Sequence, residues 1–117
     1  MAIYTSTPTG TKASEWNVLT DDERREREKS GIEAWHEWAR ANGAAIVDGG
    51  TALGQTRRTS RTGIAQVKND LCACVIVRAE SHEAAAKLFE NHPFYTMLPG
   101  DAVETMECLP TPPEYKP

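Results

Sequence analysis

The 117-residue sequence has few cysteines, few aromatic residues and no long hydrophobic run. Its three cysteines lack the spacing of a disulfide framework, which is typical of a reduced protein. No apolar run approaches the ~18–20 residues that a membrane-spanning helix needs. The first residues also lack the charged and apolar regions of a signal peptide. We therefore expect a cytoplasmic protein without a membrane partner.

The charge and the composition narrow the class of protein further. The formal net charge of −4 and the pI near 5.4 argue against a nucleic-acid partner, which would favour a basic surface. The length fits a single folded unit. We expect a strand and loop over residues 1–19, an α+β domain over residues 20–110 and a proline-rich tail over residues 111–117.

The first half of the chain predicts a strand, a long helix and a second strand. Met1–Thr5 could be an edge strand, and Ser6–Ser14 is typical of a loop. Thr20 with Glu23 forms a capping-box pattern that begins a helix, and Gly43 is a natural stop. The strand expected at Ala44–Val47 ends at two glycines that suit a bulge or a close backbone approach.

The second half predicts strands on both sides of another helix. Residues 55–62 are polar and suit an exposed hairpin strand or a long loop, and residues 64–68 suit a strand. Leu71–Ala79 is apolar on both faces, which predicts a strand in the middle of a sheet. Ser81 caps a helix whose apolar stripe runs to His92, and Pro93 should end it. The last strand is expected at Ala102–Leu109.

This order of elements predicts an α+β fold. It is the β-α-β-β-α-β order of a ferredoxin-like protomer, with an extra hairpin strand possible around residues 55–62. The helices of such a fold cover one face of an antiparallel sheet. Because Leu71–Ala79 offers apolar side chains to both faces, we expect the second face to be covered in a homodimer.

Two segments carry a resemblance to a known family. VIVRAESHEAAAKLFENHP, followed by PGDAVETMECLP, resembles the YCII-related family, in its branch with an AES-EAA-K-F--HP pattern. GIEAWHEWARANGAAIVDGGTALG is similar to that family's first helix and glycine-rich turn. The resemblance implies a dimeric α+β barrel with a pocket between helices and sheet. A His–Asp pair has been suggested as the active site of some members. The position expected for that histidine is near Gly31 in this sequence, and the next histidine along the chain is His36.

His92 and Asp48 are the candidate catalytic residues. His92 lies in the apolar stripe just before Pro93, and imidazole titrates near neutral pH, which suits acid–base chemistry. It could equally be a helix-ending histidine that bonds the last carbonyls. Asp48 could orient His92 or bind substrate, although an aspartate before two glycines often only makes a turn.

Other side chains are candidates for ligand binding or for reactivity. Tyr95 follows the second helix and could line a pocket, whereas Trp35 has the helical spacing of a core residue. Cys72 and Cys74 share one strand face and behave as small core residues unless Arg78 activates a thiolate. The candidate ligand-binding residues are Tyr95, Arg78, Trp38 and His36.

A basic cluster and the histidines complete the candidate sites. Arg57, Arg58 and Arg61 could bind an anion or an acidic partner, or could simply keep an exposed edge strand from pairing. The three histidines have no metal-ligand spacing, so we expect neither a metal nor a cofactor.

Two hypotheses on function follow. One is a small cofactor-free enzyme that uses His92 on a small organic substrate, aromatic or carbonyl-bearing. The alternative is a non-catalytic dimer that binds a metabolite or a protein. A pocket in which His92 meets Asp48 or Tyr95 would favour the enzyme.

Overall fold

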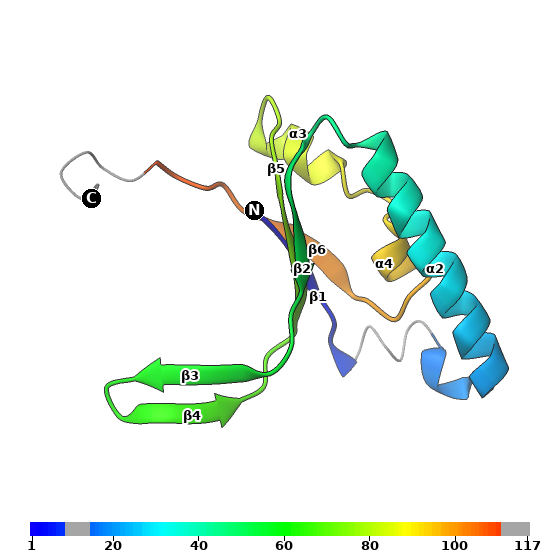
Figure 1. Cartoon of the computed structure of the whole chain (residues 1–117), viewed down its shortest axis with the longest axis horizontal. Helices are drawn as coiled ribbons and strands as arrows, with labels where there is room; N and C mark the ends of the chain where they lie inside the picture. Colours follow the sequence, from blue (N-terminus) through cyan, green and yellow to red (C-terminus); the bar gives the residue numbers. More distant parts are fainter. Residues whose placement is uncertain (9–14, 111–117) are drawn as a thin grey trace.

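The computed structural model describes residues 1–8 and 15–110 of the chain. The predicted tail and part of the predicted loop therefore lie outside the described residues. No helix in the described ranges combines the length and the apolarity that crossing a membrane would need. The elements (Figure 1) are β1 (Ala2–Thr5), η1 (Trp16–Val18), α2 (Asp21–Ala41), β2 (Ile46–Ala52), β3 (Thr56–Ser60), β4 (Gly63–Val67), β5 (Leu71–Val77), α3 (His82–Lys87), α4 (Pro93–Thr96) and β6 (Ala102–Thr105).

An antiparallel sheet with helices on one side confirms the predicted α+β class. The strand order is β2-β5-β1-β6, and α2, α3 and α4 all lie on the same face (Figure 1). This arrangement is compatible with a ferredoxin-like fold. β5 lies in the middle of the sheet as predicted. The edge position expected for Met1–Thr5 is wrong, because β1 pairs with both β5 and β6.

Helix α2 begins at the predicted capping box. The Thr20 hydroxyl accepts from the Glu23 amide, and the Glu23 carboxylate accepts from the Thr20 amide. The helix passes unbroken through Gly31, which is buried against Leu98. A Cβ at Gly31 would lie 2.7 Å from the Leu98 side chain, so glycine permits the close contact between α2 and the segment after α4.

Strand β2 is longer than predicted because the chain continues through its glycines. Gly50 has a φ of 69°, and its amide donates to the Asp48 carboxylate at 2.8 Å. A Cβ on Gly50 would stand 1.7 Å from the carbonyl oxygen of Cys74. The pairing of β2 with β5 shifts register on both sides of Asp48. The bulge and the close backbone approach that the glycines predict are therefore confirmed.

The second helix is shorter than predicted and is followed by a separate one. Ser81 caps α3 as expected, but α3 ends at Lys87 rather than at His92. Pro93 does not merely end a helix; it is the first residue of α4, where its fixed φ is favourable and its missing N–H costs nothing. His92 is the N-cap of α4, so its interpretation as a helix-ending residue is wrong.

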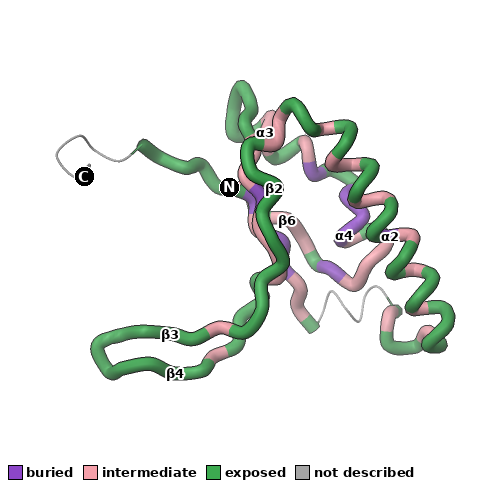
Figure 2. The backbone as a smooth tube through the Cα atoms, in the orientation of Figure 1, coloured by how far each residue is buried: buried purple, intermediate pink, exposed green. Residues whose placement is uncertain are grey.

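Of the two alternatives for residues 55–62, the hairpin strand is the correct one, and the hairpin stands apart from the main sheet. β3 and β4 pair only with each other within the described structure, as a two-stranded sheet that leaves the ends of β2 and β5 (Figure 1). Figure 2 shows that its residues are nearly all exposed, whereas the buried residues gather between the main sheet and the helices. The last strand ends at Thr105, before the predicted Leu109.

Candidate functional site

A cluster of aromatic rings encloses His92 between the sheet and the helices. The imidazole is fully buried, with ring centroids 4.7 Å from Trp38, 4.9 Å from Trp35 and 5.1 Å from Tyr4. Tyr4 comes from β1, and both tryptophans come from one face of α2. Phe89 packs against the same ring, and Phe94 completes the core by packing against Tyr4 and Trp35. The N-cap position of His92 thus directs its side chain into the protein.

The hydrogen bonds of His92 define its tautomer. The Phe94 amide donates to Nδ1 at 3.0 Å, so Nδ1 carries no proton. The neutral ring then carries its proton on Nε2 and donates it to the Tyr4 hydroxyl, 3.2 Å away. We therefore assign the Nε2-protonated tautomer, with both ring nitrogens satisfied.

Burial keeps both members of this pair neutral. Loss of solvation lowers the pKa of His92 from 6.5 to about 4, since the charged imidazolium is disfavoured in the core. Loss of solvation also raises the pKa of Tyr4 above its ordinary value, and a hydrogen bond with Trp35 acts in the opposite direction. At neutral pH the pair is therefore an uncharged imidazole and an uncharged phenol.

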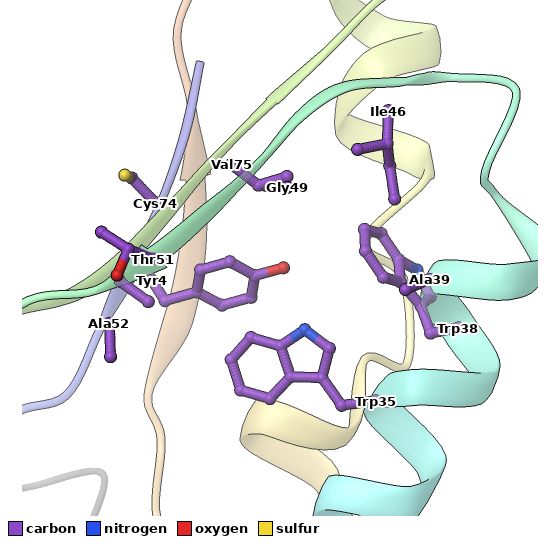
Figure 3. A pocket seen from close by; sticks show the side chains of 11 residues that line it. Tyr4, Trp35, Trp38, Ala39, Ile46, Gly49, Thr51, Ala52, Cys74 and Val75 are labelled. Carbon is purple, nitrogen blue, oxygen red and sulfur yellow. The ribbon is translucent and has the colours of Figure 1, made fainter.

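A pocket of about 270 Å³ lies between α2 and the strands β2 and β5. Figure 3 shows the Tyr4 ring extending from the sheet toward α2, with the indole nitrogen of Trp35 beside its hydroxyl. The pocket has no charged side chain among its lining residues, which are Tyr4, Trp35, Trp38, Ala39, Ile46, Gly49, Thr51, Ala52, Ala73, Cys74 and Val75. Its size and lining suit a small apolar or aromatic molecule.

The Tyr4 hydroxyl keeps its own proton for such a molecule. A hydroxyl can accept two hydrogen bonds and donate one. His92 Nε2 donates to it at 3.2 Å, which uses one of its acceptor positions. Its own proton can then be donated to an acceptor in the pocket, such as a carbonyl oxygen.

The predicted catalytic group is not assembled in the structure. The hydrogen bonds of the His92 ring go to Tyr4 and Phe94, not to Asp48 or Tyr95. The Asp48 carboxylate makes the turn at Gly50, and the Tyr95 hydroxyl donates to the Phe89 carbonyl at 2.6 Å. His92 is also sealed in the core and does not line the pocket. The contact of His92 with Asp48 or Tyr95 that would have favoured the enzyme is therefore not found in the described structure.

The predicted ligand-binding residues are distributed over different parts of the fold. Trp38 lines the pocket, and its indole N–H donates to the Leu88 carbonyl at 2.7 Å. Arg78 is exposed beyond the end of β5, beside a different hollow near β6. His36 is exposed on α2 and lies outside the pocket lining. Of the predicted set, only Trp38 is part of this site.

The cysteines and histidines form no second reactive centre in the described ranges. Cys72 and Cys74 are free, and burial raises the pKa of the Cys72 thiol, which disfavours a thiolate. No group of three metal-ligating side chains gathers in the described residues. His82 bonds the Thr105 carbonyl at 2.7 Å from the first position of α3, and it is not among the residues around His92.

Tyr4 is the site residue that the sequence did not reveal. The signal was present in its alternation with Ala2, because residues two apart in a strand share a face. Both side chains are buried against the helices. The four-residue strand is too short for alternation alone to mark it as central.

The fold and the site define a small α+β protein with a neutral, aromatic-lined pocket between its helices and its sheet. No protein-family model matches the chain, and neither does a curated protein or a solved structure.

Proposed function

We propose that the protein is a binding module for a small aromatic or apolar compound that carries a hydrogen-bond acceptor. The observation that carries this proposal is the Tyr4 hydroxyl in an uncharged aromatic pocket, where it is held by His92 Nε2 at 3.2 Å. The rings provide apolar contact, and the hydroxyl proton provides orientation. An acidic or basic ligand is disfavoured, because it would lose its hydration without an opposite charge in the lining.

A matched pair of probes tests the role of Tyr4. Acetophenone and ethylbenzene have nearly the same shape, but only acetophenone has a carbonyl acceptor. We expect Tyr4→Phe to weaken acetophenone binding about five- to tenfold, the equivalent of one hydrogen bond, and to leave ethylbenzene binding unchanged. Titration followed by tryptophan fluorescence measures both affinities. Equal losses for the two probes would contradict the proposal.

The location of the pocket is tested by filling it. Ala39 lines the pocket on α2, and Ala41 is exposed near the end of the same helix. Ala39→Phe is expected to abolish probe binding, whereas Ala41→Phe keeps it, with circular dichroism checking that both variants fold.

A second candidate is the cofactor-free acid–base enzyme. The Tyr4 hydroxyl favours it, because a phenol that donates a hydrogen bond to a substrate carbonyl would stabilise the enolate formed when hydroxide from the solvent removes an α-proton, while His92 holds the phenol in place. Exchange of the methyl protons of acetophenone with D₂O, followed by NMR and lost in Tyr4→Phe, would indicate this enzyme. Binding without exchange indicates the binding module.

We further propose that the chain is a YCII-related protein that forms a ferredoxin-like dimeric α+β barrel. The face of the sheet away from the helices supports this proposal. Ile3 is paired with Cys74 on that face, and Figure 3 shows the Cys74 sulfur directed away from the Tyr4 ring. Ile76 follows Cys74 by two positions on β5 and so shares its face, and Figure 1 shows the helices of the described structure only on the opposite face of the sheet. Sedimentation is expected to show a dimer at micromolar concentration, and a stable monomer would contradict it.

A further inference from the structure

The β3–β4 hairpin, residues 56–67, forms an arm that extends from the body of the protein. Figure 1 shows that it leaves the ends of β2 and β5 and projects to the side of the sheet away from α2. It therefore extends on the same side as the uncovered face that carries Ile3, Cys74 and Ile76, which we call the open face.

The arm has little to stabilise it within one chain. At its base Asn69 donates to the Thr56 hydroxyl at 3.0 Å, and Ser60 bonds Thr62 within its turn. Ile64 is 70% exposed on it. An isolated two-stranded hairpin is marginally stable at best in water, so an arm of this kind gains stability when another surface covers it.

The arm is basic although the chain is acidic. Residues 55–69 contain Arg57, Arg58, Arg61 and Lys68 and no acidic residue. They carry +4 of a chain total of −4, which leaves −8 on the remaining residues. None of the three arginines forms an ion pair with a carboxylate in the described ranges. The basic groups are therefore available to an acidic surface outside their own protomer.

Exposed carboxylates border the open face at both edges of the sheet. Glu104 on β6 is paired with Ile3, and Asp48 on β2 is paired with Ile76. Directly paired residues of antiparallel strands share a face, so both carboxylates belong to the open face. The chain thus presents an apolar strip with acidic margins, beside a basic arm.

We propose that the arm embraces a second copy of this chain. Arg57 and Arg58 point to opposite faces of β3, so the one that faces the partner would meet the carboxylate at the nearer edge of the partner's sheet, the partner's Asp48 or the partner's Glu104. This interaction rests on the proposed dimer and deepens it. A five-residue strand extends about 17 Å, whereas packed sheets are about 10 Å apart. The arm is therefore long enough to reach the edge of a sheet packed on the open face.

The charge distribution favours a second copy over nucleic acid. A phosphate backbone would meet three arginines on the arm and Lys68 at its base, but also the net charge of −8 on the residues outside 55–69. A second copy supplies both the apolar strip and the carboxylates. It also repeats the contact by symmetry, because each arm meets the other protomer.

Charge reversal on the arm tests the proposal. Arg57→Glu/Arg58→Glu is expected to raise the dimer dissociation constant at least tenfold, measured by sedimentation equilibrium at low salt. The matched control, Arg25→Glu/Lys29→Glu, changes the same charge on an exposed part of α2 and should stay within about twofold of the wild type.

Reversing the partner charges provides the complementary test. Asp48→Lys/Glu104→Lys should also weaken the dimer, and adding it to the arm variant should restore the affinity to within about threefold of the wild type. If the arm variant and the α2 control weaken the dimer equally, or if the combined variant does not restore it, the proposed contact of the arm is wrong although the dimer itself stands. A monomeric wild type overturns the dimer as well.

Discussion

The free energy of unfolding should fall by about 3 kcal/mol between pH 6.5 and pH 4 through the titration of His92. The pKa of this group is about 4 in the folded protein and 6.5 in its ordinary range. Above pH 6.5 the ring is neutral in both states, and the full stability is present. As the pH falls toward 4, the unfolded chain binds a proton that the buried ring does not, so stability decreases. Below the folded pKa both states are protonated, and the loss is complete.

The carboxylates also titrate in this range, so a variant must isolate the contribution of His92. His92→Asn keeps an acceptor for the Phe94 amide and removes the titration. Because it loses the bond to Tyr4 and leaves a small cavity, it should be about 2 kcal/mol less stable at pH 7. Because the wild type loses about 3 kcal/mol over this range through His92 and the variant does not, the difference should pass through zero and reverse as the pH falls to 4. Urea unfolding at a fixed protein concentration, followed by tryptophan fluorescence, measures it. A difference that is constant over this range would contradict the assignment.

Replacing Gly50 should destabilise the protein by about 3 kcal/mol. An L residue pays about 1–2 kcal/mol in the left-handed region, where Gly50 lies with a φ of 69°. The new Cβ would also meet the Cys74 carbonyl at 1.7 Å, and relieving such a clash typically costs about 1–3 kcal/mol. Gly50→Ala is therefore expected to lower strongly the urea concentration at which half of the protein is unfolded. Without urea, the circular dichroism spectrum of the variant should match that of the wild type.

The neighbouring glycine is the matched control for this prediction. A Cβ added at Gly49 would have no other heavy atom within 4 Å, and Gly49 does not have a positive φ. Gly49→Ala should therefore change the stability by no more than about 0.5 kcal/mol. Equal losses in the two variants would show that the glycine pair acts through chain flexibility rather than through the contact with β5.

The features that depend on neighbouring residues could be predicted from the sequence. The capping box at Thr20, the cap at Ser81 and the apolar pattern of β5 all concern groups within a few positions of one another. The same local patterns led to a wrong prediction for His92, which was expected to lie in the second helix. Its spacing fits the helical stripe from Ala84, but the helix ends after Lys87 and the chain starts again at Pro93.

The sequence by itself determined the α+β class, the long capped helix and the central apolar strand, because each depends on periodicity or on a cap. It left residues 55–62 open between a hairpin strand and a loop, and the tertiary structure decided for the hairpin. Only the tertiary structure decided that β1 is central and that Tyr4 meets His92, which is 88 positions away. It also decided that His92 is a buried cap rather than a group in the pocket. Contacts of this kind form between segments that are far apart in the sequence, and local sequence patterns do not show which of these segments pack together.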